Sequence, residues 1–311
     1  DWSSDVCSSD LEFRSTVAAD LVVDVLGYYR PTASASSGRW VVTTPYRLGD
    51  ASVAAGSSAN LTVGAPVPDD AAGVLVSITV SGVDGPWSIG GLSAVTARSG
   101  EITTNRYIVR PGPLAITSAS GGQVSVDVVG WYTGASAPVG TEGLFVASTP
   151  IRVLDTTSLP DPLGAGVAIH AGWTVEIPFV MPGAGAVLAN VITTNAHGAG
   201  DVIAHPAGRE RGSARVASST RAGAGSSGQI PIGLAERGVA VFASGGTEAT
   251  VDVVGWFVGS AMASSSARPS NPMPAPDPFP GYLVVPSIKL STMVRENVDL
   301  VNLDPVHIPE T

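Results

Sequence analysis

Hydrophobic and polar residues alternate in short runs along most of the chain, and clusters of Gly, Pro, Ser and Asp separate these runs. In residues 124–129, three valines at alternate positions share one face of an extended backbone, whereas Asp127 lies on the opposite face. Turn signals recur about every 8–12 residues, a spacing typical of antiparallel sheets. The pattern predicts an all-β protein whose valine-rich faces pack against opposing sheets.

One strand motif occurs three times, at residues 23–29, 126–132 and 251–257. Each copy reads Val-Asp-Val, a branched hydrophobic residue, Gly, and two aromatic residues. Branched and aromatic side chains fit a pleated, half-buried surface, so each copy is predicted to be a strand. Recurrence at long spacing indicates tandem repeats, with the motif as the closing strand of each repeat.

The glycine and the aromatic residues of this motif have expected structural roles. Gly130 is expected to let the chain bend or bulge, and Trp131 or Tyr132 to close one end of the core. Gly255 and Trp256 occupy the same positions in the third copy.

The openings of two repeats, residues 38–50 and 143–155, align without a gap and share a Pro-x-Arg segment followed by Asp. Asp is a poor strand former, so its presence in every motif copy suggests that it has a partner. The candidate ion pairs are Arg47 with Asp127 and Arg152 with Asp252, which would tie the first strand of each repeat to the last. The alternative is that these groups are solvated and independent.

Each repeat has about 100–120 residues and seven or eight short strands, the size of a β-sandwich. We therefore expect tandem antiparallel β-sandwich-like domains, a Pro/Ser-rich linker, and the first strands of a further domain. The expected boundaries are 12–30 for the remnant of an earlier repeat, 38–135 and 143–260 for two complete repeats, 261–280 for the linker, and 281–311 for the start of the next domain.

The composition of the chain excludes several kinds of site and partner. Residues 1–11 resemble the translation of a sequencing adapter and include Cys7, the chain's single cysteine, so we expect no disulfide and no Cys-based site. The net charge of −10 argues against nucleic acid and anionic membranes as partners. No apolar run approaches the roughly 18 residues of a transmembrane helix.

One cluster has the residue types of a metal site: His197, Asp201 and His205. Zinc accepts such ligands. The flanking glycines instead favour a hairpin turn, and the first repeat has no histidine at this place. We therefore expect no metal, no cofactor and no catalytic residue in the repeats.

The motifs of the repeats resemble those of tandem β-rich repeats in exported actinobacterial surface proteins. This resemblance implies no catalytic or binding residues for the repeats. The tail resembles the start of a sortase domain, most similar to class E. Residues Gly281–Val294 give a strand, a Pro break and a second strand. His307-Ile308-Pro309-Glu310-Thr311 matches a Gly-His-x-Pro-Gly-Thr segment, except that Val306 precedes the histidine and Glu310 stands where Gly is usual.

The resemblance to sortases implies a cysteine transpeptidase whose active site uses a Cys, a His and an Arg. The resemblance implies that all three lie beyond Thr311 and that His307 is not the catalytic histidine. We expect a non-catalytic extracellular stalk or wall-facing module of a cell-surface protein whose sortase-like domain is truncated here, with a cell-wall polymer or a surface protein as candidate partner. The alternative is a structural, adhesive or carbohydrate-binding repeat protein without an enzyme domain.

Overall fold

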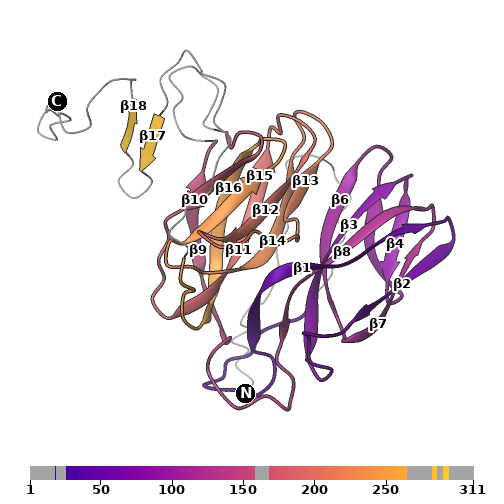
Figure 1. Cartoon of the computed structure of the whole chain (residues 1–311), viewed down its shortest axis with the longest axis horizontal. Helices are drawn as coiled ribbons and strands as arrows, with labels where there is room; N and C mark the ends of the chain where they lie inside the picture. Colours follow the sequence, from indigo (N-terminus) through magenta and orange to yellow (C-terminus); the bar gives the residue numbers. More distant parts are fainter. Residues whose placement is uncertain (1–17, 19–25, 158–167, 265–281, 286–289, 294–311) are drawn as a thin grey trace, which may run out of the picture. The chain divides into compact units, whose positions relative to one another are not determined.

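The computed structural model describes residues 18, 26–157, 168–264, 282–285 and 290–293 (Figure 1). Contacts divide the chain into two compact units, Asp1–Arg30 and Pro31–Thr311. Every regular element among the described residues is a β-strand, and all paired strands are antiparallel. The predicted all-β, sandwich-like fold is therefore confirmed.

The first sandwich consists of eight strands in two four-stranded sheets. The strands are β1 (Trp40–Val53), β2 (Ser57–Val63), β3 (Gly73–Gly82), β4 (Gly85–Ile89), β5 (Leu92–Ala97), β6 (Ile102–Val109), β7 (Gly112–Ser118) and β8 (Gly122–Tyr132). Sheet 1A has the order β1-β8-β3-β6, and sheet 1B has the order β2-β7-β4-β5.

The second sandwich repeats this plan. Its strands are β9 (Phe145–Asp155), β10 (Trp173–Ile177), β11 (Ala184–Thr194), β12 (Gly200–Pro206), β13 (Ala217–Ser219), β14 (Ser226–Gly233), β15 (Val239–Ala243) and β16 (Glu248–Val258). Sheet 2A has the order β9-β16-β11-β14, and sheet 2B has the order β10-β15-β12-β13. The strand orders of the second sandwich equal those of the first when eight is added to each strand number. Both sandwiches therefore have the strand order of a jelly roll.

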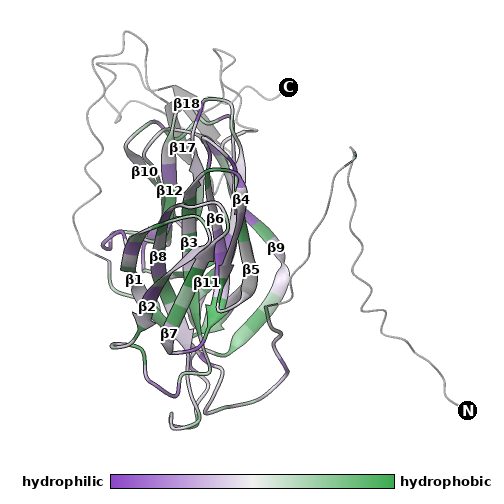
Figure 2. Cartoon of the chain, turned by 90° about the vertical axis from the view of Figure 1, so that its right-hand side faces the viewer, coloured by the Kyte–Doolittle hydropathy of each residue, from purple (hydrophilic) through white to green (hydrophobic). Residues whose placement is uncertain are grey.

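The valine face of β8 lies in the core of the first sandwich. Val124, Val126 and Val128 are buried with residues of sheet 1B, including Trp87 and Ile116. Figure 2 shows hydrophobic residues concentrated along strands such as β7 and β11. The period-two pattern of the sequence thus identifies the face that each central strand turns inward.

The opposite, outer face of sheet 1A is also buried. Leu75, Ser77 and Thr79 of β3 are at most 8% exposed, although they point away from the first core. Leu75 belongs instead to the hydrophobic cluster of the second sandwich, together with Trp40 and Val129. The second sandwich therefore covers sheet 1A, and the two repeats share one compact unit.

A segment found only in the second repeat makes much of this contact. Gly90-Gly91 joins β4 to β5, whereas ten residues, 207–216, join the corresponding strands β12 and β13. In this segment the Ser213 N–H donates to the carbonyl of Pro45 at 3.1 Å. The Ser77 hydroxyl donates to the carbonyl of Arg215 at 3.1 Å, so the insertion is hydrogen-bonded to two strands of sheet 1A.

Four aromatic rings from the first and last strands lie at the junction of the sandwiches. Trp40 packs on Tyr132 with centroids 5.2 Å apart, and Phe145 packs on Phe257 at the same distance. Trp40 and Phe257, 5.6 Å apart, join the two pairs. Aromatic contacts of this kind add to the burial of apolar surface.

The start of the predicted Pro/Ser-rich linker is docked on the second sandwich. Met262 exchanges backbone hydrogen bonds with Leu234 and Glu236, and the Ser264 hydroxyl donates to the carbonyl of Ala207. The linker from residue 265 onward lies outside the described residues. Farther on, β17 (Tyr282–Val285) and β18 (Leu290–Met293) are the two strands expected from the sequence, and they form an antiparallel pair.

The first copy of the closing-strand motif differs from the prediction. Its described part, residues 26–29, lies outside any strand, and Leu26 and Tyr28 are exposed. In the complete repeats the same motif lies between two neighbouring strands, and no described strand borders residues 26–29. The prediction of a strand there is therefore wrong for these residues, because a strand requires a ladder partner. The sequence resembling an adapter lies outside the described residues.

The motif glycines provide a test of the fold. A Cβ at Gly130 would overlap the Trp40 ring, and the backbone of Val41 lies within 2.9 Å. We expect Gly130→Ala to lower the free energy of unfolding by about 2 kcal/mol through overpacking, as measured by denaturant titration. Gly64, with no atom within 4 Å, is the matched control, and Gly64→Ala should be neutral or stabilising. Equal effects of the two changes would contradict this explanation.

Candidate functional site

Both Arg–Asp pairs expected from the sequence are present, and each joins the first strand of a sandwich to its last. Arg47 Nε donates to Asp127 Oδ1 at 2.7 Å. Arg152 Nε and Nη2 donate to the two carboxylate oxygens of Asp252 at 2.6 and 2.9 Å. Each arginine also pairs with the aspartate three residues later, Asp50 or Asp155. The solvated alternative is therefore excluded.

The two equivalent pairs lie in different environments. The Asp127 side chain is 0% exposed, whereas that of Asp252 is 15% exposed and that of Arg152 is 48% exposed. The hydrogen bonds that Arg152 donates to Asp252, and then to Asp155, raise its pKa above the ordinary value for arginine. The residue types of the two pairs are the same, so the burial of the Asp127 carboxylate results from its position beneath the second sandwich, although the Arg47 side chain is still 31% exposed.

The motif glycines lie beside β-bulges, as expected. The pairing of β8 with β3 skips Val129, and the pairing of β16 with β11 skips Val254. A Cβ at Gly255 would overlap the Phe145 ring, which corresponds to Trp40 over Gly130. Each glycine thus leaves room for the aromatic residue that begins the first strand.

The two motif tryptophans are half-buried. Trp131 packs against the core of the first sandwich, and Trp256 packs against the core of the second. The neighbouring ring in the second sandwich, Phe257, is 1% exposed and lies within the core itself. The paired aromatic residues therefore contribute to packing in both repeats.

The His197, Asp201 and His205 cluster does not assemble. Asp201 and His205 are four residues apart on β12, a separation of about 13 Å along a strand. Asp201 pairs with Arg215 at 2.7 Å and accepts a hydrogen bond from Ser218. Burial lowers the pKa of His205 below its usual value. Within the described ranges, no three His, Cys, Asp or Glu side chains lie close enough to hold a metal ion.

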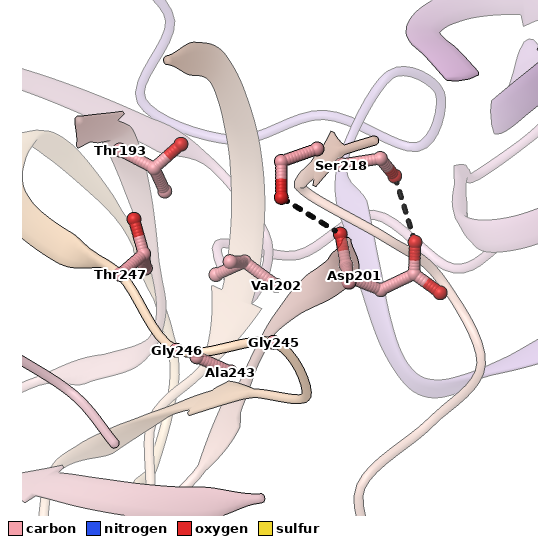
Figure 3. Close-up of a pocket in the computed structure, with 10 residues that line it drawn as sticks. Thr193, Asp201, Val202, Ser218, Ala243, Gly245, Gly246 and Thr247 are labelled. Carbon is pink, nitrogen blue, oxygen red and sulfur yellow. Dashed lines mark hydrogen bonds between the residues drawn. The ribbon is translucent and has the colours of Figure 1, made fainter. Parts of the chain in front are cut away.

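A small cavity lies at one end of the second sandwich (Figure 3). Figure 3 shows Thr193 and Thr247 on one side of it and Asp201 and Ser218, joined by a hydrogen bond, on the other. Its volume of about 10 Å³ is enough for roughly one water molecule. The cavity is therefore too small for an organic ligand.

Sequence reasoning did not identify Arg106, which is buried between the sandwiches. Its Nη2 donates to the carbonyls of Arg215 and Val216, both at 2.8 Å. Burial lowers the pKa of Arg106 to about 10, so the side chain remains charged at neutral pH. Gly228 leaves the space that the guanidinium occupies. The corresponding position of the second sandwich is the exposed Gln229, and this Arg-to-Gln difference between the aligned repeats was the available signal.

A polar groove of about 460 Å³ lies between the sandwiches. The first sandwich lines it with residues 96, 98 and 101–104, and the second with residues 218–221 and 223–226. These segments belong to or adjoin the edge strands β5, β6, β13 and β14. The volume falls in the range of about 300–1,000 Å³ that ligand sites occupy. Sequence reasoning missed the groove because its two walls are far apart in the chain.

No family model and no curated protein matches this chain. Among solved structures, the crystal structure of the protein YhaK from Escherichia coli aligns with 71% of this chain and 92% of its own. The identity is 11% and the TM-score is 0.22, a value too low for the likeness to carry an argument. No helix that could cross a membrane occurs among the described residues.

Unequal burial of the two ion pairs gives a test. We expect Asp127→Asn to lower the free energy of unfolding by about 3 kcal/mol, because it disrupts a pair with a fully buried carboxylate. Asp252→Asn, the matched change in the more exposed pair, should cost about 1 kcal/mol. Denaturant titrations of both variants measure the difference. A larger cost for Asp252→Asn would show that burial does not set the strength of these pairs.

Proposed function

We propose that the two jelly rolls form a non-catalytic, wall-facing spacer of an exported cell-surface protein. We further propose that this spacer carries a sortase-like domain beyond the Pro-rich linker. The observation that supports the spacer most directly is the burial of the outer face of sheet 1A beneath the second sandwich. A buried interface that combines apolar contacts with hydrogen bonds restricts relative domain motion, and a spacer needs a fixed distance between its ends.

The role of the Arg–Asp pairs supports a structural function. Both pairs join first and last strands, and their guanidinium and carboxylate groups are already engaged with each other. A catalytic site usually occurs once in a fold, whereas an architectural element recurs with the repeat. The pairs therefore favour a structural role for each sandwich.

Polar contacts across the interface support a single relative orientation. Arg106 donates to two carbonyls of the second repeat, and the Thr104 and Ser218 hydroxyls lie 3.3 Å apart. Buried polar networks are directional, so they select one arrangement among those that apolar contact alone would permit. The docked residues Met262 and Ser264 give the linker a defined starting point.

The proposed sortase-like domain rests on the sequence resemblance of residues 281–311. The antiparallel pair β17 and β18 is compatible with the first strands of a β-barrel. His307 lies outside the described residues. In this proposal the transpeptidase nucleophile is a cysteine supplied by the continuation of the chain.

Reading the gene beyond Thr311 tests the catalytic part of the proposal. We expect an Ala-Gly-His segment within about 20 residues and a Thr-x-x-Cys strand farther on, because a cysteine nucleophile requires a base nearby. Another β repeat, or a stop codon directly after Thr311, would contradict a sortase-like domain. That result would favour the alternative of an adhesive or carbohydrate-binding repeat protein.

The coupling of the sandwiches has its own test. We expect Leu75→Asp to separate them, because it places a charge in a buried apolar contact that is solvent-facing in an isolated first sandwich. Calorimetry should change from one unfolding transition to two, and small-angle scattering should show a larger radius of gyration. The cost should be about 2–4 kcal/mol.

Leu188 is the matched control because it occupies the same position in the second sandwich and is only half-buried. Leu188→Asp should keep a single transition and the original radius of gyration. If Leu75→Asp also kept both, the two sandwiches would not behave as a coupled spacer.

A further inference from the structure

The groove between the sandwiches has walls rich in hydroxyl groups. Thr96 and Thr103 lie on the first sandwich, and Ser219, Thr220 and Ser226 lie on the second. A hydroxyl both donates and accepts hydrogen bonds, and it rotates to suit its partner. Such walls match a ligand whose own groups are hydroxyls, because each ligand group can meet either role.

Two arginines add positive charge to these walls. Arg98 and Arg221 line the groove from opposite sandwiches, and both are exposed. Guanidinium groups bind carboxylates in a planar, two-point geometry. Arg221 Nη2 lies 3.9 Å from Glu101 Oε1, and no ion pair of Arg98 occurs within the described part of the chain. A ligand carboxylate could therefore bind Arg98 directly, whereas at Arg221 it would compete with Glu101.

The groove is built on fixed elements. The Thr104 and Ser218 hydroxyls contact each other between the walls, and Ser218 also donates to Asp201. Arg106 holds the adjoining segment through Arg215 and Val216. A groove with walls joined in this way loses little conformational entropy on binding.

These observations distinguish a saccharide from a peptide. A groove that recognises an extended peptide offers apolar pockets for alternate side chains, and here the apolar side chains in the lining are Ile102 and Ala224. The lining contains no aromatic ring for a sugar to stack on, so binding is weak for a single short ligand. We propose that this groove binds an acidic oligosaccharide, with Arg98 and Arg221 contacting its carboxylates. This inference rests on the proposed wall-facing function and names the class of wall polymer involved.

The net charge of −10 does not oppose such binding at physiological salt. At 0.15 M ionic strength charges farther away than about 8 Å are largely screened. The local arginines therefore outweigh distant acidic residues. We expect this balance to reverse at very low salt, where the repulsion extends farther.

The test is a calorimetric or NMR titration of the whole chain with trigalacturonic acid in 0.15 M NaCl, beside its fully methyl-esterified form. We expect a dissociation constant of about 1 mM or below for the acid, and binding about tenfold weaker for the neutral ester. NMR shifts should map to residues 96–104 and 218–226. Equal binding of acid and ester, shifts elsewhere, or no binding would each overturn the proposal.

Single substitutions test which charged side chains contact the ligand. Arg98→Gln and Arg221→Gln should each weaken binding of the acid about fivefold, and Glu101→Gln should strengthen it, because an exposed pair contributes up to about 1 kcal/mol. Arg110→Gln removes the same charge from an exposed residue outside the groove and should leave binding unchanged. Equal loss in Arg110→Gln and Arg98→Gln would indicate unspecific attraction and overturn the proposal.

Failure here is distinguishable from failure of the spacer. The groove substitutions are on exposed side chains and leave the Leu75 contact intact. If the two sandwiches unfold as one unit but do not bind trigalacturonic acid, the proposal of a spacer stands and the proposal of a saccharide ligand is wrong. Preference for an extended acidic peptide over the saccharide would likewise reject it.

Discussion

The structure depends on the pairing of the first strand of each repeat with the last. These strands are about 80 to 100 residues apart, so their pairing closes a long loop of chain. An Arg–Asp ion pair and an aromatic ring seated on a glycine reinforce that closure in both sandwiches. This pair of strands forms one side of sheet 1A in the first sandwich and of sheet 2A in the second.

The same motif has different consequences in the two repeats because its surroundings differ. The carboxylate of the first ion pair is fully buried beneath the second sandwich, whereas both groups of the second pair are partly exposed. The ten-residue segment 207–216 produces this asymmetry, since the first repeat has two glycines in its place. The two sandwiches therefore share one plan, and the longer connection of the second contacts the first in a unit with a groove between its edge strands.

Much of the fold follows from the sequence because its signals are local or repeated. Period-two alternation predicts strands and their inward faces, and gap-free alignment of the repeats predicts which Arg meets which Asp. The strand prediction fails at Leu26–Tyr29, where the local pattern is right but no neighbouring strand borders it. The groove and the partners of Arg106 were not predictable, because these contacts join segments with no shared pattern. The Arg-to-Gln difference between the aligned repeats marks the position of Arg106 but not what it binds.

By itself the sequence determined the tandem repeat, the sandwich fold and the ion pairs that close each sandwich. Only the tertiary structure decided which outer face is buried. From residue type alone, the more apolar outer face of the second sandwich would be expected to be the buried one. Instead Thr79 of the first sandwich is buried, whereas the corresponding Ile192 of the second is partly exposed. The physical reason is that burial here depends on the distant insertion, whose carbonyls accept hydrogen bonds from Ser77 and Arg106 on the polar face of the first sandwich. The corresponding apolar positions of the second sandwich stay partly exposed.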